Sequence, residues 1–173
     1  MSLSRLQTAV RIDCDSWQST VPDLSKKCRE AVHAAWTMGR TALDSAHPLA
    51  GPLSAPIEVS VLFSSDAFIQ KLNHRHLGKD SPTNVLSFPG DDNAIGESEI
   101  LLGDVILAWE TVQSEAALAH KSLVDHATHM VIHGVLHLLG YDHDCEIEAE
   151  IMERLEVDSL ALLGIPNPYE GER

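Results

Sequence analysis

Three histidines within eleven residues are the clearest chemical feature of the sequence, since His133, His137 and His143 form an H-x3-H-x5-H array. In a helix, His133 and His137 project from one face, with roughly 5–6 Å between their Cβ atoms. A divalent cation can bind between two imidazoles at that separation. Gly140 is then a natural left-handed helix stop, and the turn after it can bring His143 back toward the other two. The spacing therefore predicts a metal held by three nitrogen atoms.

Three protein ligands with one open coordination position are typical of catalytic zinc, whereas structural zinc is usually closed by four ligands. Two histidines at helical spacing are also compatible with hydrogen-bonded core residues. The glycine stop and the third histidine favour the metal, because an apolar helix would otherwise bury unsatisfied imidazoles. The apolar positions of this segment are Met130, Val131, Val135, Leu136, Leu138 and Leu139.

The segment HGVLHLLGYDH, residues 133 to 143, resembles the signature of the YbeY family of bacterial endoribonucleases, which mature rRNA. Two more segments are similar to recurrent parts of that family: LNHRHLGKDSPTNVLSFP at 72 to 89, and LLGDVILA at 101 to 108. One position departs from the family pattern. Leu77 stands where the family usually has an arginine, and Arg75 lies two residues earlier.

The resemblance implies a zinc-dependent endoribonuclease specific for single-stranded RNA. It implies one Zn²⁺ per chain, with His133, His137 and His143 as the ligands and catalytic residues. The implied role is rRNA maturation at the 3′ end of 16S rRNA, within ribosome biogenesis and quality control. The implied partners are rRNA in the small ribosomal subunit, a small-subunit ribosomal protein and an assembly GTPase, with neither a membrane nor DNA.

The general base of such a reaction is left open by the sequence. A zinc ion would polarise a phosphodiester oxygen or activate a water molecule. The proton acceptor could be Asp104, Asp142, Asp144 or a 2′-hydroxyl of the RNA. His129 precedes His133 by one helical turn and is compatible with a proton shuttle, a spare metal ligand, a residue behind the ligands or a core histidine.

Two other residues are candidates for substrate contact. Ser87 lies in the segment that resembles the family, and Arg75 lies in the compact basic cluster of Lys71, His74, Arg75, His76 and Lys79. Turn and strand-end roles explain Ser87 equally well, and a cluster of this kind is more often a solvated helix face than a binding site.

The same array has the histidine and glycine spacing of the metzincin proteases, H-E-x-x-H-x-x-G-x-x-H. Position 134 is Gly rather than Glu, however. In those proteases the glutamate is the general base that activates water, so a peptidase of this sequence would lack its proton acceptor. We therefore expect a metzincin-like site without the peptidase chemistry.

Composition limits the remaining possibilities. A chain of 173 residues with 44% hydrophobic content fits one globular domain over residues 1–173. The formal net charge of −14 opposes a protein that coats nucleic acid nonspecifically. The acidic charge keeps open a second function, that of a zinc-containing ribosome-assembly factor without catalytic activity. A metallopeptidase is a third alternative. Three widely spaced cysteines, no signal peptide and no apolar run of about 18 residues predict a cytoplasmic protein.

Periodicity predicts an α+β fold with a small mixed, mostly parallel sheet of about four strands, one of them antiparallel. Helices pack on the sheet, and one buried helix carries the histidines. The predicted strands are residues 5 to 13, 57 to 63, 85 to 88 and 101 to 108, with 85 to 88 at an edge and an acidic loop at 90 to 99. The predicted helices are residues 22 to 40, 67 to 76, 110 to 119, 123 to 139 and 146 to 163.

Overall fold

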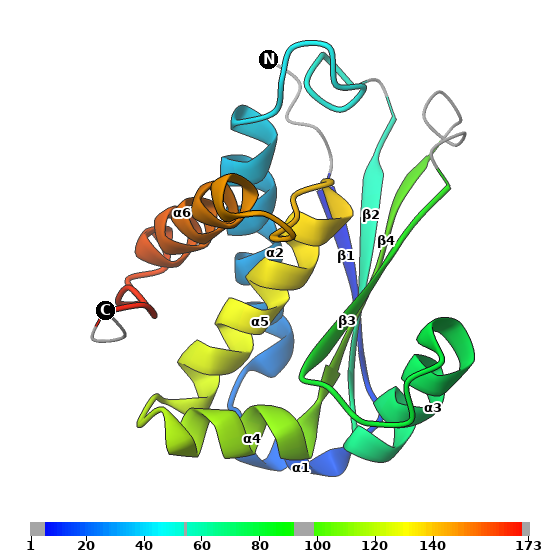
Figure 1. The fold of residues 1–173 in the computed structure, drawn as a ribbon, viewed down its shortest axis with the longest axis vertical. Coiled ribbons are helices and arrows are strands. Elements are labelled where there is room, and N and C mark those ends of the chain that lie inside the picture. Colours follow the sequence, from blue (N-terminus) through cyan, green and yellow to red (C-terminus); the bar gives the residue numbers. More distant parts are fainter. Residues whose placement is uncertain (1–5, 54, 92–98, 171–173) are drawn as a thin grey trace.

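A four-stranded sheet forms the frame of the part of the chain that the computed structural model describes, residues 6–53, 55–91 and 99–170 (Figure 1). Its strands are β1 (Leu6–Ile12), β2 (Ile57–Ser64), β3 (Val85–Pro89) and β4 (Ile100–Ala108), in the order β1-β2-β4-β3. β1 with β2 and β2 with β4 are parallel pairs, and β3 runs antiparallel to β4 at the edge. The predicted α+β class and mixed sheet are confirmed.

The pairing of β2 with β4 contains one irregularity. Glu58 pairs with Leu101, but the next residue, Val59, pairs with Gly103, so β4 carries one extra residue at this point. Gly103 has a φ of 141°. A Cβ there would lie 2.3 Å from the carbonyl oxygen of Phe88 on β3, so only glycine fits this bulge.

The extra residue changes which face of the sheet the later side chains of β4 occupy. Ile100 and Leu102 lie in the main core before the bulge, and Val105 and Leu107 lie in it afterwards. Because side chains alternate along a strand, Asp104 then points to the opposite face. It lines a hollow on that face.

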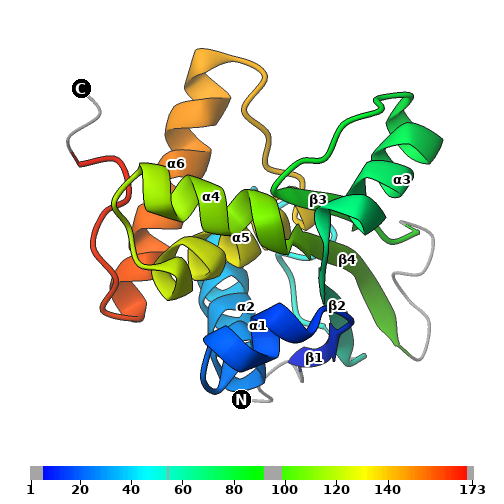
Figure 2. The same cartoon turned by 90° about the horizontal axis from the view of Figure 1, so that it is seen from below.

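Helices cover the two faces of the sheet unequally (Figures 1 and 2). α2 and α5 pack on one face with α6 outside them, and the main core lies between these helices and the sheet. α3 packs on the other face, over a smaller cluster around Ile69, Ile106 and Ala108. The helices are α1 (Asp15–Thr20), α2 (Leu24–Thr41), α3 (Asp66–Leu77), α4 (Trp109–Leu118), α5 (Leu123–Leu138) and α6 (Glu146–Leu162).

These bounds agree with the predicted elements to within about two residues, and α1 is an addition. α1 is six residues long, too short for a helical period to show, and it is held in place by Trp17. That side chain is fully buried and packs edge-on against Phe63 and Trp109. Residues 92–98 of the predicted acidic loop lie outside the described residues. No helix in the described ranges combines the length and apolarity that a membrane span requires.

Candidate metal centre

α5 is the element that positions two of the three histidines. It begins after Ser122, whose hydroxyl accepts a hydrogen bond from the backbone N–H of Asp125 at 3.2 Å. Such a cap satisfies one of the helix's free N–H groups. Most of the helix from Ala127 onward is buried, whereas His133 and His137 are only half-buried. The two imidazoles therefore occupy the open side of an otherwise buried helix.

The turn after α5 is fixed at both ends. Gly140 has a φ of 92°, and its N–H donates to the carbonyl of His137 at 3.0 Å. The N–H of Tyr141 donates to the carbonyl of Leu136 at 3.1 Å, which completes a glycine-terminated helix end. The Tyr141 hydroxyl donates to the carbonyl of Gly39 on α2 at 2.7 Å. The predicted left-handed stop at Gly140 is present, and Tyr141 anchors the turn to the core.

This turn returns the third histidine to the first two. The ring of His143 lies 5.1 Å from that of His137 and 5.5 Å from that of His133, between centroids. The Asp142 carboxylate accepts a hydrogen bond from the His143 backbone N–H at 2.8 Å and so shapes the turn. One nitrogen from each ring lies within 4.8 Å of the others, so the three histidines are positioned to bind a metal ion.

The donor set and its spacing fit zinc. The Nε2 atoms of His133 and His137 are 3.1 Å apart. Two nitrogen ligands at a zinc–nitrogen distance of about 2.0–2.1 Å are separated by roughly 3.3 Å when the angle between them is tetrahedral. In the described residues the group consists of three histidines, which is the number of protein ligands in catalytic zinc sites.

The electrostatics of the site favour a neutral, metal-binding imidazole at His137. Burial lowers its pKa below the usual value, and the neighbouring His133 and His143 lower it further. A hydrogen bond with the Tyr141 backbone and the charge of Asp142 partly oppose this shift. A neutral ring keeps its lone pair for a metal at neutral pH.

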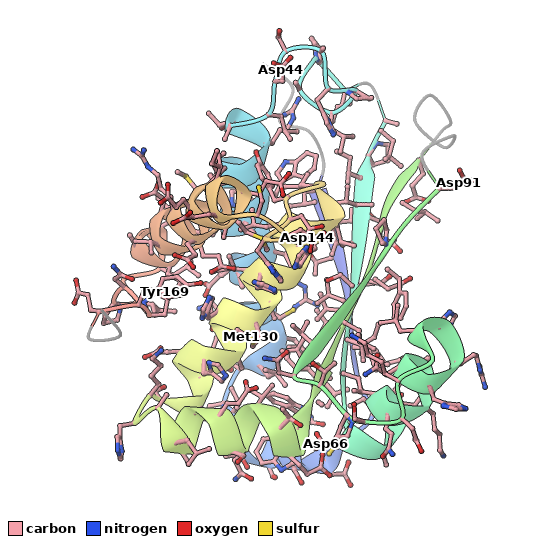
Figure 3. The ribbon with its side chains drawn as sticks, viewed as in Figure 1. Asp44, Asp66, Asp91, Met130, Asp144 and Tyr169 are labelled. Atoms are coloured by element: carbon pink, nitrogen blue, oxygen red, sulfur yellow. The ribbon has the colours of Figure 1, made fainter. Side chains whose placement is uncertain are left out.

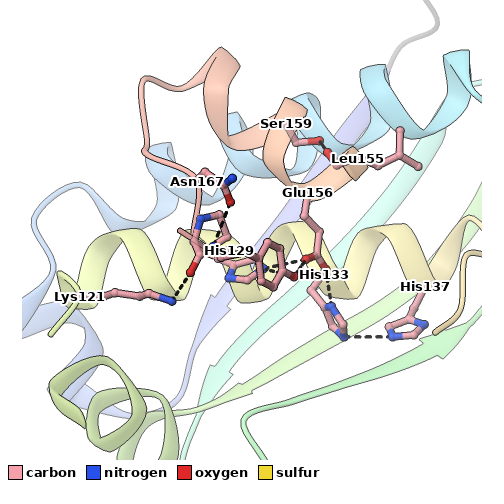
Figure 4. A network of polar contacts seen from close by, with 10 residues as sticks. Lys121, His129, His133, His137, Leu155, Glu156, Ser159 and Asn167 are labelled. Atoms are coloured by element: carbon pink, nitrogen blue, oxygen red, sulfur yellow. Dashed lines mark hydrogen bonds and ion pairs between the residues drawn. The ribbon is translucent and has the colours of Figure 1, made fainter. Parts of the chain in front are cut away.

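A buried carboxylate lies behind the histidines (Figure 4). Glu156 of α6 is 1% exposed, and its side chain contacts His129 and His133 of α5. Burial alone would raise the pKa of Glu156, but hydrogen bonds from the two histidines and their charge lower it to about 2. The group is therefore ionised at neutral pH, and it is a hydrogen-bond acceptor only.

The other candidate residues are distributed over several places. Ser87 lies beside the cluster, where its hydroxyl donates to the carbonyl of Gly134 at 3.0 Å and ties β3 to α5. Asp142 and Asp144 are exposed in the turn around His143. Figure 3 shows Asp144 near the end of α5. Asp104 faces the hollow on the opposite face of the sheet.

Two further candidates are separated from the three-histidine cluster. His129 is buried and bonded to Glu156, which places it behind the cluster. Arg75 lies on α3 with Lys71 and His74, around a surface hollow whose lining includes none of the three histidines. The structure therefore groups Ser87, His129 and Asp142 with the cluster, and it does not bring Asp104 or Arg75 to it.

Sequence reasoning missed Glu156 and Tyr169. Acidic residues of a helix usually face the solvent, but Glu156 belongs to the buried face with Met152 and Leu160. Its place four residues after Met152 and four before Leu160 was the available signal. Tyr169 follows the last helix, and no pattern links it to α5.

A buried histidine helix on a mostly parallel sheet defines an α+β protein in which three imidazoles converge at the end of the helix and are positioned to bind a metal ion. The family model described as "Endoribonuclease YbeY" matches residues 14–164. The chain belongs to this family.

Two relatives and one solved structure illustrate the similarity. The Endoribonuclease YbeY of Paramagnetospirillum magneticum is 43% identical over 168 residues, 95% of this chain and 96% of the relative. That of Magnetococcus marinus is 50% identical over 134 residues, 72% of this chain and 90% of the relative. The solution structure of TM1509 from Thermotoga maritima has a TM-score of 0.51 and 21% identity, over 91% of this chain and 92% of that one, and supports the fold alone.

Proposed function

We propose that this protein is a zinc-dependent endoribonuclease that cuts single-stranded RNA during rRNA maturation, with the 3′ end of 16S rRNA in the small subunit as its substrate. The observation that carries the proposal is the convergence of His133, His137 and His143, with 3.1 Å between the Nε2 atoms of the first two. The family name supplies the reaction, and the donor set supplies zinc as the metal.

The chain's own residues account for binding and orientation. His133 and His137 would bind the metal from a helix held rigidly in the core, and His143 would close the site from the anchored turn. When bound, zinc supplies a Lewis acid for the phosphodiester group. Ser87 holds β3 against α5 through its hydrogen bond to the carbonyl of Gly134, the residue that follows His133.

Asp142 is the carboxylate that we propose as proton acceptor. It is exposed, and its charge acts on the ring of His137. Asp144 lies in the same turn and is the alternative, whereas Asp104 lies on the opposite face of the sheet. A base beside the metal-binding imidazoles can reach a nucleophile that approaches the same centre.

A non-catalytic assembly factor is the second candidate function. Two features reduce the attraction of the protein for RNA phosphates. One is the net charge of −14, and the other is Leu77 at the end of α3, which is 57% exposed and carries no charge. A peptidase is opposed by Gly134, because a side chain there would point into Val105 and Ser87 rather than open space.

The test is incubation of zinc-loaded protein with single-stranded rRNA fragments that span the 3′ end of 16S rRNA, and separately with casein, each with and without chelator. We expect chelator-sensitive cleavage of RNA and none of casein. His137→Ala should lose the activity, and His33→Ala, which alters an exposed histidine of α2, should retain it. RNA binding without cleavage would favour the assembly factor, and casein cleavage would favour the peptidase.

A further inference from the structure

The carboxylate of Glu156 is buried beside His133 without being part of the three-histidine cluster. Its side chain extends from α6 toward α5 (Figure 4), and the buried face of α6 that carries it also includes Met152, Leu155 and Leu160. Removing an ionised carboxylate from water is costly unless its oxygens receive hydrogen bonds. The contacts of Glu156 therefore indicate what keeps it there.

Both oxygens of Glu156 are occupied. Oε1 lies 2.5 Å from Nδ1 of His133, and Oε2 lies 2.9 Å from Nε2 of His129. Oε2 also accepts a hydrogen bond from the hydroxyl of Tyr169. One carboxylate thus joins two histidines of α5 to a tyrosine that follows α6.

The contact with His133 fixes the state of that ring. A carboxylate can only accept, so Nδ1 of His133 must carry the proton. The lone pair of a neutral ring is then on Nε2, and this is the atom that lies 3.1 Å from Nε2 of His137. Carboxylates bonded to the far nitrogen of a ligating histidine fix its tautomer and its orientation in metal sites generally.

The contact with Tyr169 ties the segment after α6 to this arrangement. The ring of Tyr169 packs edge-on against that of His129, with 5.7 Å between centroids. One residue earlier, the carbonyl of Pro168 accepts a hydrogen bond from Lys121 Nζ at 2.6 Å. The segment is therefore attached to the start of α5 as well as to the carboxylate.

We propose that Glu156 is the positioning residue of the metal centre, which holds His133 with Nε2 toward the metal, and that Tyr169 holds Glu156 in that position. This inference rests on the metal site of the proposed function. It adds to that site two residues that lie 13 and 26 positions beyond His143 in the chain.

The first measurement uses the wild-type protein without metal. A ¹⁵N–¹H correlation spectrum of the histidine rings at mildly alkaline pH reports which nitrogen of His133 is protonated. We expect the proton on Nδ1, although free imidazole side chains favour the other tautomer. A proton on Nε2 would overturn the inference, whatever happens to any variant.

The second measurement is the zinc dissociation constant, obtained by competition with a chromophoric chelator. Glu156→Leu removes the acceptor at similar volume and should weaken zinc binding about 10–100-fold, the usual loss when such a partner is removed. Glu156→Gln keeps one acceptor oxygen for His133 and should recover most of that loss. Tyr169→Phe should weaken zinc binding by a few-fold. Glu150→Leu, at an exposed position of the same helix, is the matched control and should bind zinc as the wild type does.

Thermal unfolding of the zinc-free variants separates positioning from a purely structural role. If Glu156→Leu lowered the melting temperature but bound zinc with the wild-type constant, Glu156 would be structural only and the inference would fail. If Glu156→Leu did not fold, the ring spectrum of the wild type and the Gln variant would decide. Should the wild type itself bind no zinc, the metal site of the proposed function would fail instead.

Discussion

Gly134 offers the sharpest test of how α5 sits on the sheet, because the metzincin proteases have their catalytic glutamate at this place in the motif. A Cβ at Gly134 would lie 2.5 Å from Cγ1 of Val105 and 3.1 Å from Oγ of Ser87. Ordinary carbon contacts are about 3.5–4.0 Å, so α5 would have to move by roughly 1 Å. We therefore expect Gly134→Glu to damage the fold rather than to create a peptidase.

The size of the loss follows from three contributions. Overpacking of a well-packed core costs about 1–3 kcal/mol. A carboxylate buried without a partner costs several kcal/mol more, and the better helix propensity of Glu over Gly returns less than about 1 kcal/mol. The net loss is about 4 kcal/mol or more, a large part of the roughly 5–15 kcal/mol by which domains are stable.

Urea unfolding followed by circular dichroism, on zinc-free protein, measures this loss. Gly51→Glu is the matched control, because a Cβ at Gly51 meets nothing within 4 Å. A Gly134→Glu protein within about 1 kcal/mol of the wild type, or one that hydrolyses casein when loaded with zinc, would refute the reasoning.

Three further predictions concern the metal and the RNA. His137→Ala should lose most of its zinc, because one of three ligands and the geometry of the others are removed, and stoichiometric zinc in the purified variant by metal analysis would contradict the cluster. Zinc affinity should fall as pH drops, because protons compete with zinc for the ligating rings. Since the pKa of His137 is lowered, protonation of this ring should weaken zinc binding only below a pH of about 6.5. A zinc affinity that stays constant down to mildly acidic pH would exclude this competition. Leu77→Arg should increase RNA affinity in a filter-binding assay, whereas Arg75→Ala should change it little. The reason is that α3 stays helical through Leu77, so positions 75 and 77 differ by about 200° around the helix axis. The opposite pattern would mean that Arg75 supplies the charge for RNA phosphates.

The histidine spacing and the glycine after it were sufficient to predict that the three histidines converge, because a helical turn and a left-handed stop are local features. The strands and most helices followed from periodicity for the same reason. The residues that contact the cluster from α6 and beyond could not be predicted in this way. Glu156 and Tyr169 reach α5 only through tertiary packing, and an acid in an acid-rich helix gives little sign that it faces inward.

The position of Asp104 also depends on tertiary structure and could not be predicted from the sequence. It directly precedes a run of apolar residues on β4, so its neighbours in the sequence suggest proximity to the histidine helix. Its face is decided by the bulge at Gly103, which depends on how β4 pairs with β2 and β3. Strand periodicity alone does not register an extra residue of this kind.

The bulge makes the phase of β4 depend on a single residue, Gly103, because only glycine fits there. A side chain at position 103 would exclude the bulge, and if β4 then paired regularly with β2 at full length, the rest of the strand would be out of phase, because a shift by one exchanges the two faces of a sheet. Asp104 would then turn into the core beneath α5, and Val105 and Leu107 would turn out of it. Deletion of Gly103 would instead leave regular alternation with Val105 and Leu107 on the core face, so the surface on which the histidine helix rests tolerates the loss of this residue better than its replacement by one with a Cβ.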